Sequence, residues 1–269
     1  MRKIGFRHFL DWVSIYLDYL KLHFLKLTKI PVGNKISLQG YKVHFGDMRS
    51  LDILFKEIFL KQIYNCELGD KPLIIDGGAN IGLAILYFKK KIPEARIIGF
   101  EPNPDSFNFL EQNVKVNNLE NVEIHNAALG KEDGFISFYT SSDMVSADIG
   151  ASAIKHHVEY HHTDKGELQE TKVPCMKLSP FINQSVDLLK LDIEGNESEV
   201  ISDLDVSFKF VGNSIMEYHY HANYDHNPLS NILSVMEKCN HHYLVSPVGK
   251  KDQLKDERAY IIKSQRKVS

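Results

Sequence analysis

One glycine-rich segment, Asp76-Gly-Gly-Ala-Asn-Ile-Gly82, constrains the fold of this chain more than any other feature. It follows the apolar run Leu73–Ile75 and leads into Ile81–Lys91, which has the composition of a helix and stops before Pro93. Glycine has no Cβ, so the backbone can turn tightly between a buried strand and a helix, and a ligand can lie against it. This order is the unit of a mostly parallel sheet, which binds ligands at the carboxyl ends of its strands.

The same alternation of short apolar runs and helical stretches continues from Lys71 onward and predicts an α/β fold with helices on both faces of the sheet. Two additional strands flank a polar insertion, residues 141–170. The expected strands are Leu73–Asp76, Arg96–Phe100, Val122–Asn126, Phe135–Tyr139, Thr171–Met176, Val186–Leu191, Phe210–Glu217, Tyr243–Ser246 and Ala259–Lys263. The expected helices are Ile81–Lys91, Pro104–Asn117, Glu197–Leu204 and Pro228–Lys238.

The first 69 residues have a different pattern and form an extension of the α/β domain, residues 70–269. Pro31 and Gly33 end a first, amphipathic helix, and Gln39-Gly40 predicts a small hairpin between residues 35–38 and 42–45. A second helix is expected over Ser50–Ile63. Helical spacing places one apolar stripe on the first helix: Phe6, Phe9, Leu10, Val13, Leu17 and Leu20.

This apolar stripe has three competing uses: contact with a membrane surface, a homo-oligomer interface, or packing against its own domain. Basic residues outnumber Asp11 and Asp18 in residues 1–30, which suits an anionic surface. Apolar stripes usually face protein, which favours packing or dimer formation. The segment has no uninterrupted apolar run of about 18 residues, so it predicts neither a spanning helix nor a clear signal peptide.

Charge and cysteine usage narrow the partners and the compartment. The 269 residues include 32 Lys and Arg against 35 Asp and Glu, a net charge of −3. Nucleic-acid binding depends on neutralising phosphates, so this balance argues against a nucleic-acid partner. Cys66, Cys175 and Cys239 are widely spaced and predict neither a disulfide framework nor a zinc site, which fits a reducing, cytoplasmic compartment.

A second acidic residue completes the pattern of a nucleoside site. Glu101 ends the strand that follows Asp76–Gly82 along the chain, where a carboxylate can accept both hydroxyls of a ribose. A dinucleotide fingerprint is absent, because Asn80 and Leu83 stand where its later glycines belong. The carboxylates of Asp76 and Glu101 disfavour a phosphate-rich ligand and favour cationic S-adenosylmethionine.

Acidic and histidine side chains follow two later strands, in Lys190-Leu-Asp-Ile-Glu-Gly195 and Glu217-Tyr-His-Tyr-His221. Neighbouring parallel strands would bring Asp192, Glu194, Glu217 and His219 into one pocket. His219 is the favoured general base, because the unperturbed pKa of histidine lies near neutrality. The same four residues could instead hold a divalent metal, and Asp192 and Glu194 could simply cap the helix that begins near Glu197. The sequence leaves these three interpretations open.

Four motifs resemble the FkbM family of class I S-adenosylmethionine-dependent methyltransferases: Ile75–Gly82, Gly99–Pro104, His125–Gly130 and Asp187–Gly195 with Glu197. The resemblance implies a Rossmann-like sheet of seven strands and O-methylation of a hydroxyl on a sugar, glycan or polyketide-derived molecule, as in polysaccharide biosynthesis. It also implies which residues bind the cofactor: Asp76, Gly77, Gly78, Ala79, Asn80, Gly82, Glu101, Pro102, Asn103, Asn126, Ala127 and Ala128.

A different class of function stays open beside the enzyme: a binding or scaffold protein that keeps the fold and the cofactor without turnover. Asp76 and Glu101 in one ligand-binding turn favour the enzyme. The insertion carries four histidines, which we expect in a loop that covers the acceptor: His156, His157, His161 and His162. Ser146, Asp148 and Ser152 are weaker candidates for recognising the acceptor.

Overall fold

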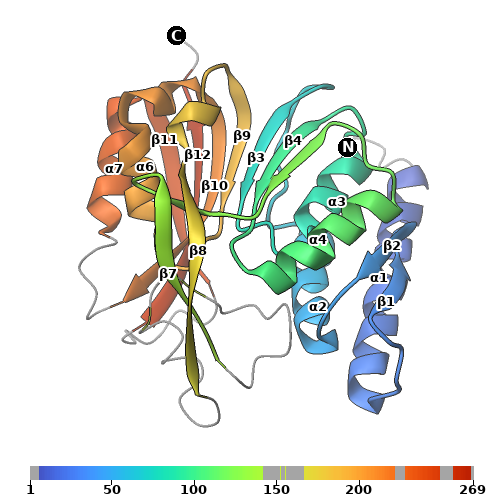
Figure 1. The fold of residues 1–269 in the computed structure, drawn as a ribbon. Coiled ribbons are helices and arrows are strands. Elements are labelled where there is room, and N and C mark those ends of the chain that lie inside the picture. Colours follow the sequence, from blue (N-terminus) through green and yellow to red (C-terminus); the bar gives the residue numbers. More distant parts are fainter. Residues whose placement is uncertain are drawn as a thin grey trace.

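A central sheet of seven strands organises the computed structural model, which describes residues 6–141, 152, 155, 167–221, 228–248 and 257–267 (Figure 1). The strand order is β11-β12-β10-β9-β3-β4-β5. Strand β12 runs antiparallel to β10 and β11, and the other neighbours are parallel. The predicted, mostly parallel sheet is therefore confirmed. Its strands are β3 (Leu73–Gly77), β4 (Arg96–Phe100), β5 (Val122–His125), β9 (Val186–Leu191), β10 (Val211–His221), β11 (His241–Pro247) and β12 (Glu257–Arg266).

Helices cover both faces of this sheet, because successive side chains of a strand point to opposite sides. Ile74 packs into one core with residues of α3 (Leu83–Lys91) and α4 (Pro104–Val116). Its neighbour Ile75 packs into a second core with residues of α6 (Glu197–Leu204) and α7 (Leu229–Lys238). Short 3₁₀ turns at Ser179–Phe181 and Asp205–Phe210 complete this second layer.

Local residue chemistry explains where two of these helices begin. Helix α4 starts as predicted, with the Asn103 side chain accepting hydrogen bonds from the amides of Asp105 and Ser106 and with Pro104 in its first turn. Helix α3 starts at Leu83, two residues later than predicted. Gly82 has a φ of 86°, a left-handed conformation that a right-handed helix cannot include.

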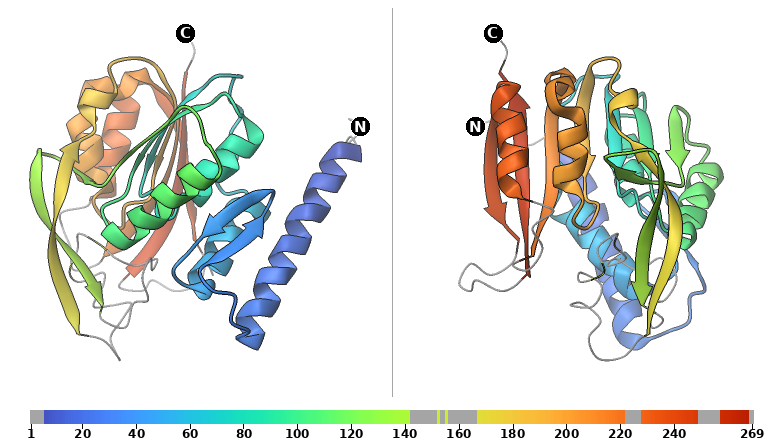
Figure 2. Two further views of the ribbon diagram at one scale, coloured as in Figure 1. Left: turned by 45° about the vertical axis from the view of Figure 1, so that its right-hand side comes forward. Right: turned by 60° about the vertical axis from the view of Figure 1, so that its left-hand side comes forward.

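The N-terminal extension packs on the side of α3 and α4. It consists of α1 (Phe6–Thr28), the hairpin β1 (Lys35–Leu38) and β2 (Tyr41–His44), and α2 (Met48–Phe55), which continues as a π-helical turn over Lys56–Leu60. The hairpin turns at Gln39-Gly40 as predicted, and it lies between α1 and α4 (Figure 2). Phe55 and Phe59 pack into the same core as α3, so the extension shares a core with the domain that follows it.

The apolar stripe of α1 faces away from the rest of the chain. Phe9, Leu17 and Phe24 are 56%, 59% and 58% exposed, whereas Ile15 and Leu22 of the opposite face are buried. Among the described residues, these exposed side chains of the stripe do not pack against the domain, which argues against one of the three uses expected for it. Among the described residues, no helix is long and apolar enough to span a bilayer.

A smaller sheet, with strand order β6-β8-β7, extends beyond the main one (Figures 1 and 2). Its strands are β6 (Ala128–Gly130), β7 (Gly134–Ser141) and β8 (Leu168–Lys177). The three-residue strand β6 was not predicted, and β8 includes residues 168–170 that were assigned to the insertion. The insertion's four histidines, together with Ser146 and Asp148, lie outside the described residues: His156, His157, His161 and His162.

Candidate active site

A pocket lies at the carboxyl ends of β3, β4, β9 and β10. Eight of the predicted cofactor residues line it: Gly78, Ala79, Asn80, Glu101, Pro102, Asn103, Ala127 and Ala128. Three of the four predicted catalytic residues line it as well, namely Asp192, Glu194 and Glu217. His219 lies behind this surface, against Glu194. The remaining predicted residues, Asp76, Gly77, Gly82 and Asn126, are not among the lining residues.

The turn after β3 is held against the neighbouring strands. The amides of Gly78 and Ala79 donate to the Phe100 carbonyl at 3.0 and 2.9 Å. A Cβ on Gly78 would lie 1.8 Å from the Asp192 carbonyl oxygen, and φ at Gly78 is 75°. Glycine is therefore required here by contact with the chain that leaves β9, and not only by the approach of a ligand.

Glu101 faces the pocket from the end of β4. Its two carboxylate oxygens accept hydrogen bonds at 2.8 Å from the amides of Asn80 and Asn103. Burial raises the pKa of Glu101 to about 7, although these two hydrogen bonds act in the opposite direction. A carboxylate has about four acceptor positions, so Glu101 can accept further hydrogen bonds from a ligand. Asn126 donates to the Glu101 carbonyl at 2.8 Å and so supports the wall from behind.

Asp76 forms a buried ion pair instead of lining the pocket. It is fully buried, and its Oδ1 lies 3.0 Å from the ammonium nitrogen of Lys190. Lys190 also donates to the carbonyls of Gly78 and Gly77 at 2.6 and 3.1 Å. Burial lowers the pKa of Lys190, but the negative charges of Asp76 and Asp192 outweigh that effect. The pKa of Lys190 is therefore raised overall, and its side chain stays a charged ammonium. Asp76 is therefore paired with Lys190 and is not a lining residue of the pocket, and its role in binding the cofactor stays a prediction.

Lys190 is a pocket residue that was not among the predicted site residues. A lysine between the apolar residues Leu188, Leu189 and Leu191 of a core strand is the signal that could have identified it, because lysine is almost never fully buried without a partner.

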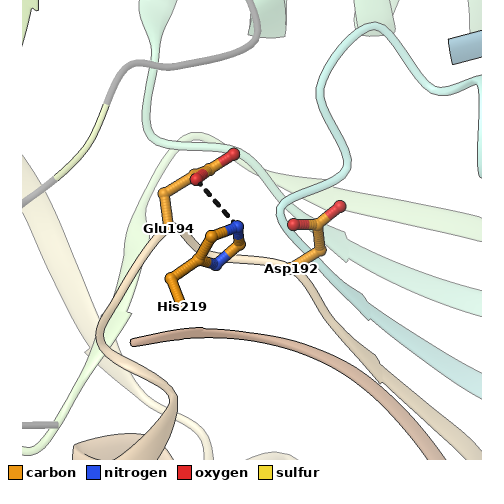
Figure 3. A group of neighbouring side chains, drawn as sticks. All are labelled: Asp192, Glu194 and His219. Carbon is orange, nitrogen blue, oxygen red and sulfur yellow. Dashed lines mark ion pairs between the residues drawn. The ribbon is translucent and has the colours of Figure 1, made fainter. Parts of the chain in front are cut away.

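His219 lies within a group of carboxylates (Figure 3). Its Nε2 is 3.2 Å from Glu194 Oε2 and 3.9 Å from Glu217 Oε1, and its Nδ1 is 3.3 Å from Glu197 Oε1. Burial lowers the pKa of His219, but these three carboxylates raise it well above the ordinary value. The raised pKa favours the protonated imidazole, which makes His219 a weaker candidate for the base; its catalytic role stays a prediction.

The neighbouring carboxylates have raised pKa values. Burial and the charge of Asp192 raise the pKa of Glu217 to about 8. Burial likewise raises the pKa of Asp192, against the effect of Lys190. The Tyr64 hydroxyl donates to Asp192 Oδ2 at 3.0 Å.

The same cluster satisfies the simplest geometric condition for a metal site. One ligand atom from each of Asp192, Glu194 and His219 lies within 4.8 Å of the others. Asn196 holds the N-cap position of α6 without a side-chain capping hydrogen bond, and the capping role of Asp192 and Glu194 stays a prediction. Glu197 instead accepts from the Gly195 amide at 2.9 Å and from His219.

One wall of the pocket comes from the N-terminal extension, through Ile53, Leu54, Glu57, Ile58 and Tyr64. Residues 1–69 were predicted as an extension of the α/β domain, and these five pocket residues were not predicted. No motif marks them, because they reach the pocket through packing of α2 and the segment after it against the sheet.

Comparisons with known proteins agree with this geometry. Residues 76–243 match the family described as the methyltransferase FkbM domain. Methyltransferase 1 of Beauveria bassiana is 32% identical over 188 residues, 64% of this chain and 75% of that protein. Methyltransferase sdnD of Sordaria araneosa is 29% identical over 189 residues, 61% of this chain and 73% of that protein.

A solved structure, methyltransferase FkbM from Methylobacillus flagellatus, is 14% identical with a TM-score of 0.45, and the match covers 73% of this chain and 44% of that one. The match to the family spans more than half of the chain and includes the strand ends that form the pocket. The chain therefore belongs to the FkbM family of S-adenosylmethionine-dependent methyltransferases.

Proposed function

We propose that this methyltransferase transfers the methyl group of S-adenosylmethionine to a hydroxyl group of a sugar, a glycan or another small hydroxylated metabolite. One observation carries the proposal: the pocket leads from the Glu101 carboxylate to Asp192, Glu194 and Glu217. A hydroxyl acceptor must lose a proton, and this end of the pocket is lined by groups that can accept one.

The pocket suits the cofactor at two points. Small side chains, Ala79, Ala127 and Ala128, line it near Glu101, which can accept hydrogen bonds from ribose hydroxyls. The acidic side chains at the other end provide a favourable environment for a cationic ligand. The turn at Gly78 and the amides that fix Glu101 need no rearrangement to offer these groups.

When bound, S-adenosylmethionine supplies an electrophilic methyl group. The protein must place the acceptor hydroxyl in line with that group and remove its proton. Glu217 is the base that we propose, because its side chain lines the pocket and its pKa of about 8 makes it a stronger base than an ordinary carboxylate.

The other side chains of the cluster orient Glu217 and balance its negative charge. Protonated His219 lies between Glu194, Glu197 and Glu217 and limits the repulsion among them. Asp192, held by Tyr64 and near Lys190, is placed to accept a hydrogen bond from the acceptor.

A divalent metal held by Asp192, Glu194, Glu217 and His219 is the alternative way to lower the pKa of the hydroxyl. The short separations within the cluster support it. Asp192 already has a cation, Lys190, and a hydrogen-bond donor, Tyr64, beside it. These two groups favour proton transfer to a carboxylate over metal binding.

The acceptor class and the location are inferred from charge and composition. A net charge of −3 fits an uncharged, hydroxyl-rich acceptor better than a polyanion and argues against nucleic acid. We infer a cytoplasmic location from the cysteine usage. We also propose a role in polysaccharide biosynthesis.

Labelled methyl transfer tests the proposal. The protein is incubated with methyl-labelled S-adenosylmethionine and panels of glycosides and hydroxylated metabolites, with Glu217→Gln as the comparison. We expect an alkali-stable methyl ether and a loss of turnover of about 10²-fold or more in the variant, at nearly unchanged affinity for S-adenosylhomocysteine. Methylation of a nitrogen or carbon atom, or full turnover in Glu217→Gln, would contradict the proposal. A protein that binds the cofactor and shows no transfer to any acceptor would support the scaffold interpretation.

A further inference from the structure

Helix α1 has apolar side chains on two faces: Ile15 and Leu22 pack into the core, and a second, larger apolar face is exposed. The large exposed apolar residues recur at helical spacing and occupy one side over about 30 Å of helix. They are Phe9, Leu10, Trp12, Tyr16, Leu17, Leu20, Phe24 and Leu27, which we call the outer face.

Specific contacts fix this orientation. Asp18 Oδ2 accepts hydrogen bonds at 2.7 Å from both the amide and the side chain of Gln39 at the hairpin turn. Lys26 pairs with the buried carboxylate of Asp52 on α2, and Lys21 donates to the Ser37 carbonyl at 2.9 Å. Rolling the helix to bury its outer face would break all three contacts, so the exposure of that face belongs to the folded protein.

The geometry points to an anionic lipid surface as the partner of the outer face, and we propose that the protein docks on such a surface through α1. Residues 1–30 carry six basic and two acidic side chains, and even without Lys26, which pairs with Asp52, their net charge is +3 in a chain whose net charge is −3. A helix with exposed leucines and aromatic rings, including the stacked Trp12 and Tyr16, and with flanking basic residues is suited to lie in the plane of a membrane interface.

The charge of residues 1–30 also favours a lipid surface over a second copy of the chain as the partner of the outer face. A dimer through the outer face would bring two segments of like charge together, whereas anionic lipid headgroups attract each of them. A contiguous exposed apolar face of this length marks an interaction surface in either case. The lipid surface is the partner that the charge favours.

Vesicle co-sedimentation of the full chain tests the proposal. The probes are vesicles of phosphatidylcholine alone and of phosphatidylcholine mixed with phosphatidylglycerol, each at low and high salt. We compare the wild type with Leu17→Glu/Phe24→Glu on the outer face and with Phe135→Glu/Leu244→Glu as a matched control. The control residues are also highly exposed, at 73% and 64%, but lie on β7 and β11.

We expect the wild type and the control to sediment with the anionic vesicles, less so at high salt, and the outer-face variant to bind at least about tenfold more weakly. The variant should keep the circular dichroism of the wild type, because it alters only exposed side chains. Failure of the wild type to bind anionic vesicles would overturn the proposal. Equal binding by the outer-face variant would overturn it too, as would a wild-type dimer in sedimentation velocity that the outer-face variant alone dissociates.

Discussion

The Tyr64 hydroxyl donates a 3.0 Å hydrogen bond to Asp192 Oδ2 and so joins the N-terminal extension to the active-site cluster. Tyr64 is 3% exposed, and the hydrogen bond lowers the pKa of Asp192, which burial raises. The extension is therefore part of the site, although the motifs of the family begin after it.

Replacing this tyrosine tests the link. Tyr64→Phe should reduce the free energy of unfolding by about 1 kcal/mol, because the partly buried carboxylate of Asp192 loses a hydrogen-bond donor. Turnover should fall as well, with affinity for S-adenosylhomocysteine nearly unchanged. Tyr87→Phe is the matched control, because the buried Tyr87 hydroxyl has no hydrogen-bond partner among the described residues. Equal effects of the two substitutions, measured by urea unfolding and methyl transfer, would show that the Tyr64 bond has no special role.

Removing residues 1–69 should abolish cooperative folding of the remaining domain. Phe55 and Phe59 share a core with Leu86 and Tyr87 of α3, and the deletion would expose that surface and open one wall of the pocket. We expect loss of a single unfolding transition and loss of S-adenosylhomocysteine binding. A truncated chain that unfolds cooperatively and binds the product normally would restore the predicted boundary between extension and domain.

Sequence reasoning predicted most of the elements and most of the cofactor pocket because those features depend on neighbouring residues. Strand alternation, the caps at Asn103 and the turn at Gln39-Gly40 are local signals. It failed where tertiary contacts decide. Nothing near Asp76 in the sequence shows that Lys190 will pair with it. Glu194 and Glu217 were predicted beside His219, but Glu197, which also raises the pKa of His219, was not. The apolar stripe of α1 was found correctly, but which side of the helix packs depends on distant partners such as Gln39 and Asp52.

The pair formed by Asp76 and Lys190 makes a strong prediction about stability. Asp76→Asn leaves a buried ammonium without its nearest counter-charge and should cost about 3–5 kcal/mol in the free energy of unfolding. Lys190→Met should cost a similar amount, and the double variant less than the sum. Lys238→Met is the control, because its ion pair with Asp205 is exposed and its loss should change stability little. Additive losses in a double-mutant cycle would contradict direct pairing.

The raised pKa of Glu101 predicts a pH dependence of cofactor-product binding. With a pKa of about 7 the group is mostly protonated below pH 7 and mostly a carboxylate above it. Ribose hydroxyls donate to the carboxylate, so affinity should fall as the pH falls through 7. We expect about tenfold weaker binding at pH 6 than at pH 8. Of the charged groups around it, Lys190 lowers the pKa and Asp76 raises it, and the raised pKa of Lys190 keeps that ammonium protonated throughout.

Calorimetry with S-adenosylhomocysteine across this pH range measures the effect. Glu101→Gln cannot titrate, so its affinity should be weaker and independent of pH. If Glu101→Gln kept the pH dependence of affinity seen in the wild type, a group other than Glu101 would be responsible for that dependence. A flat profile in the wild type would show that the carboxylate does not meet the ribose.

Removal of metal ions distinguishes the two mechanisms proposed for the acidic cluster. If Glu217 accepts the proton directly, protein treated with a chelator and dialysed should keep its turnover, because Lys190 and protonated His219 already balance the carboxylates. Turnover should then rise with pH as Glu217 ionises, with a midpoint near its pKa of about 8. Loss of turnover on chelation, with recovery on adding Mg²⁺ or a transition metal, would instead assign Asp192, Glu194 and His219 as ligands. Binding of S-adenosylhomocysteine is the control, because Glu101 and the turn at Gly78 do not depend on the cluster's metal content.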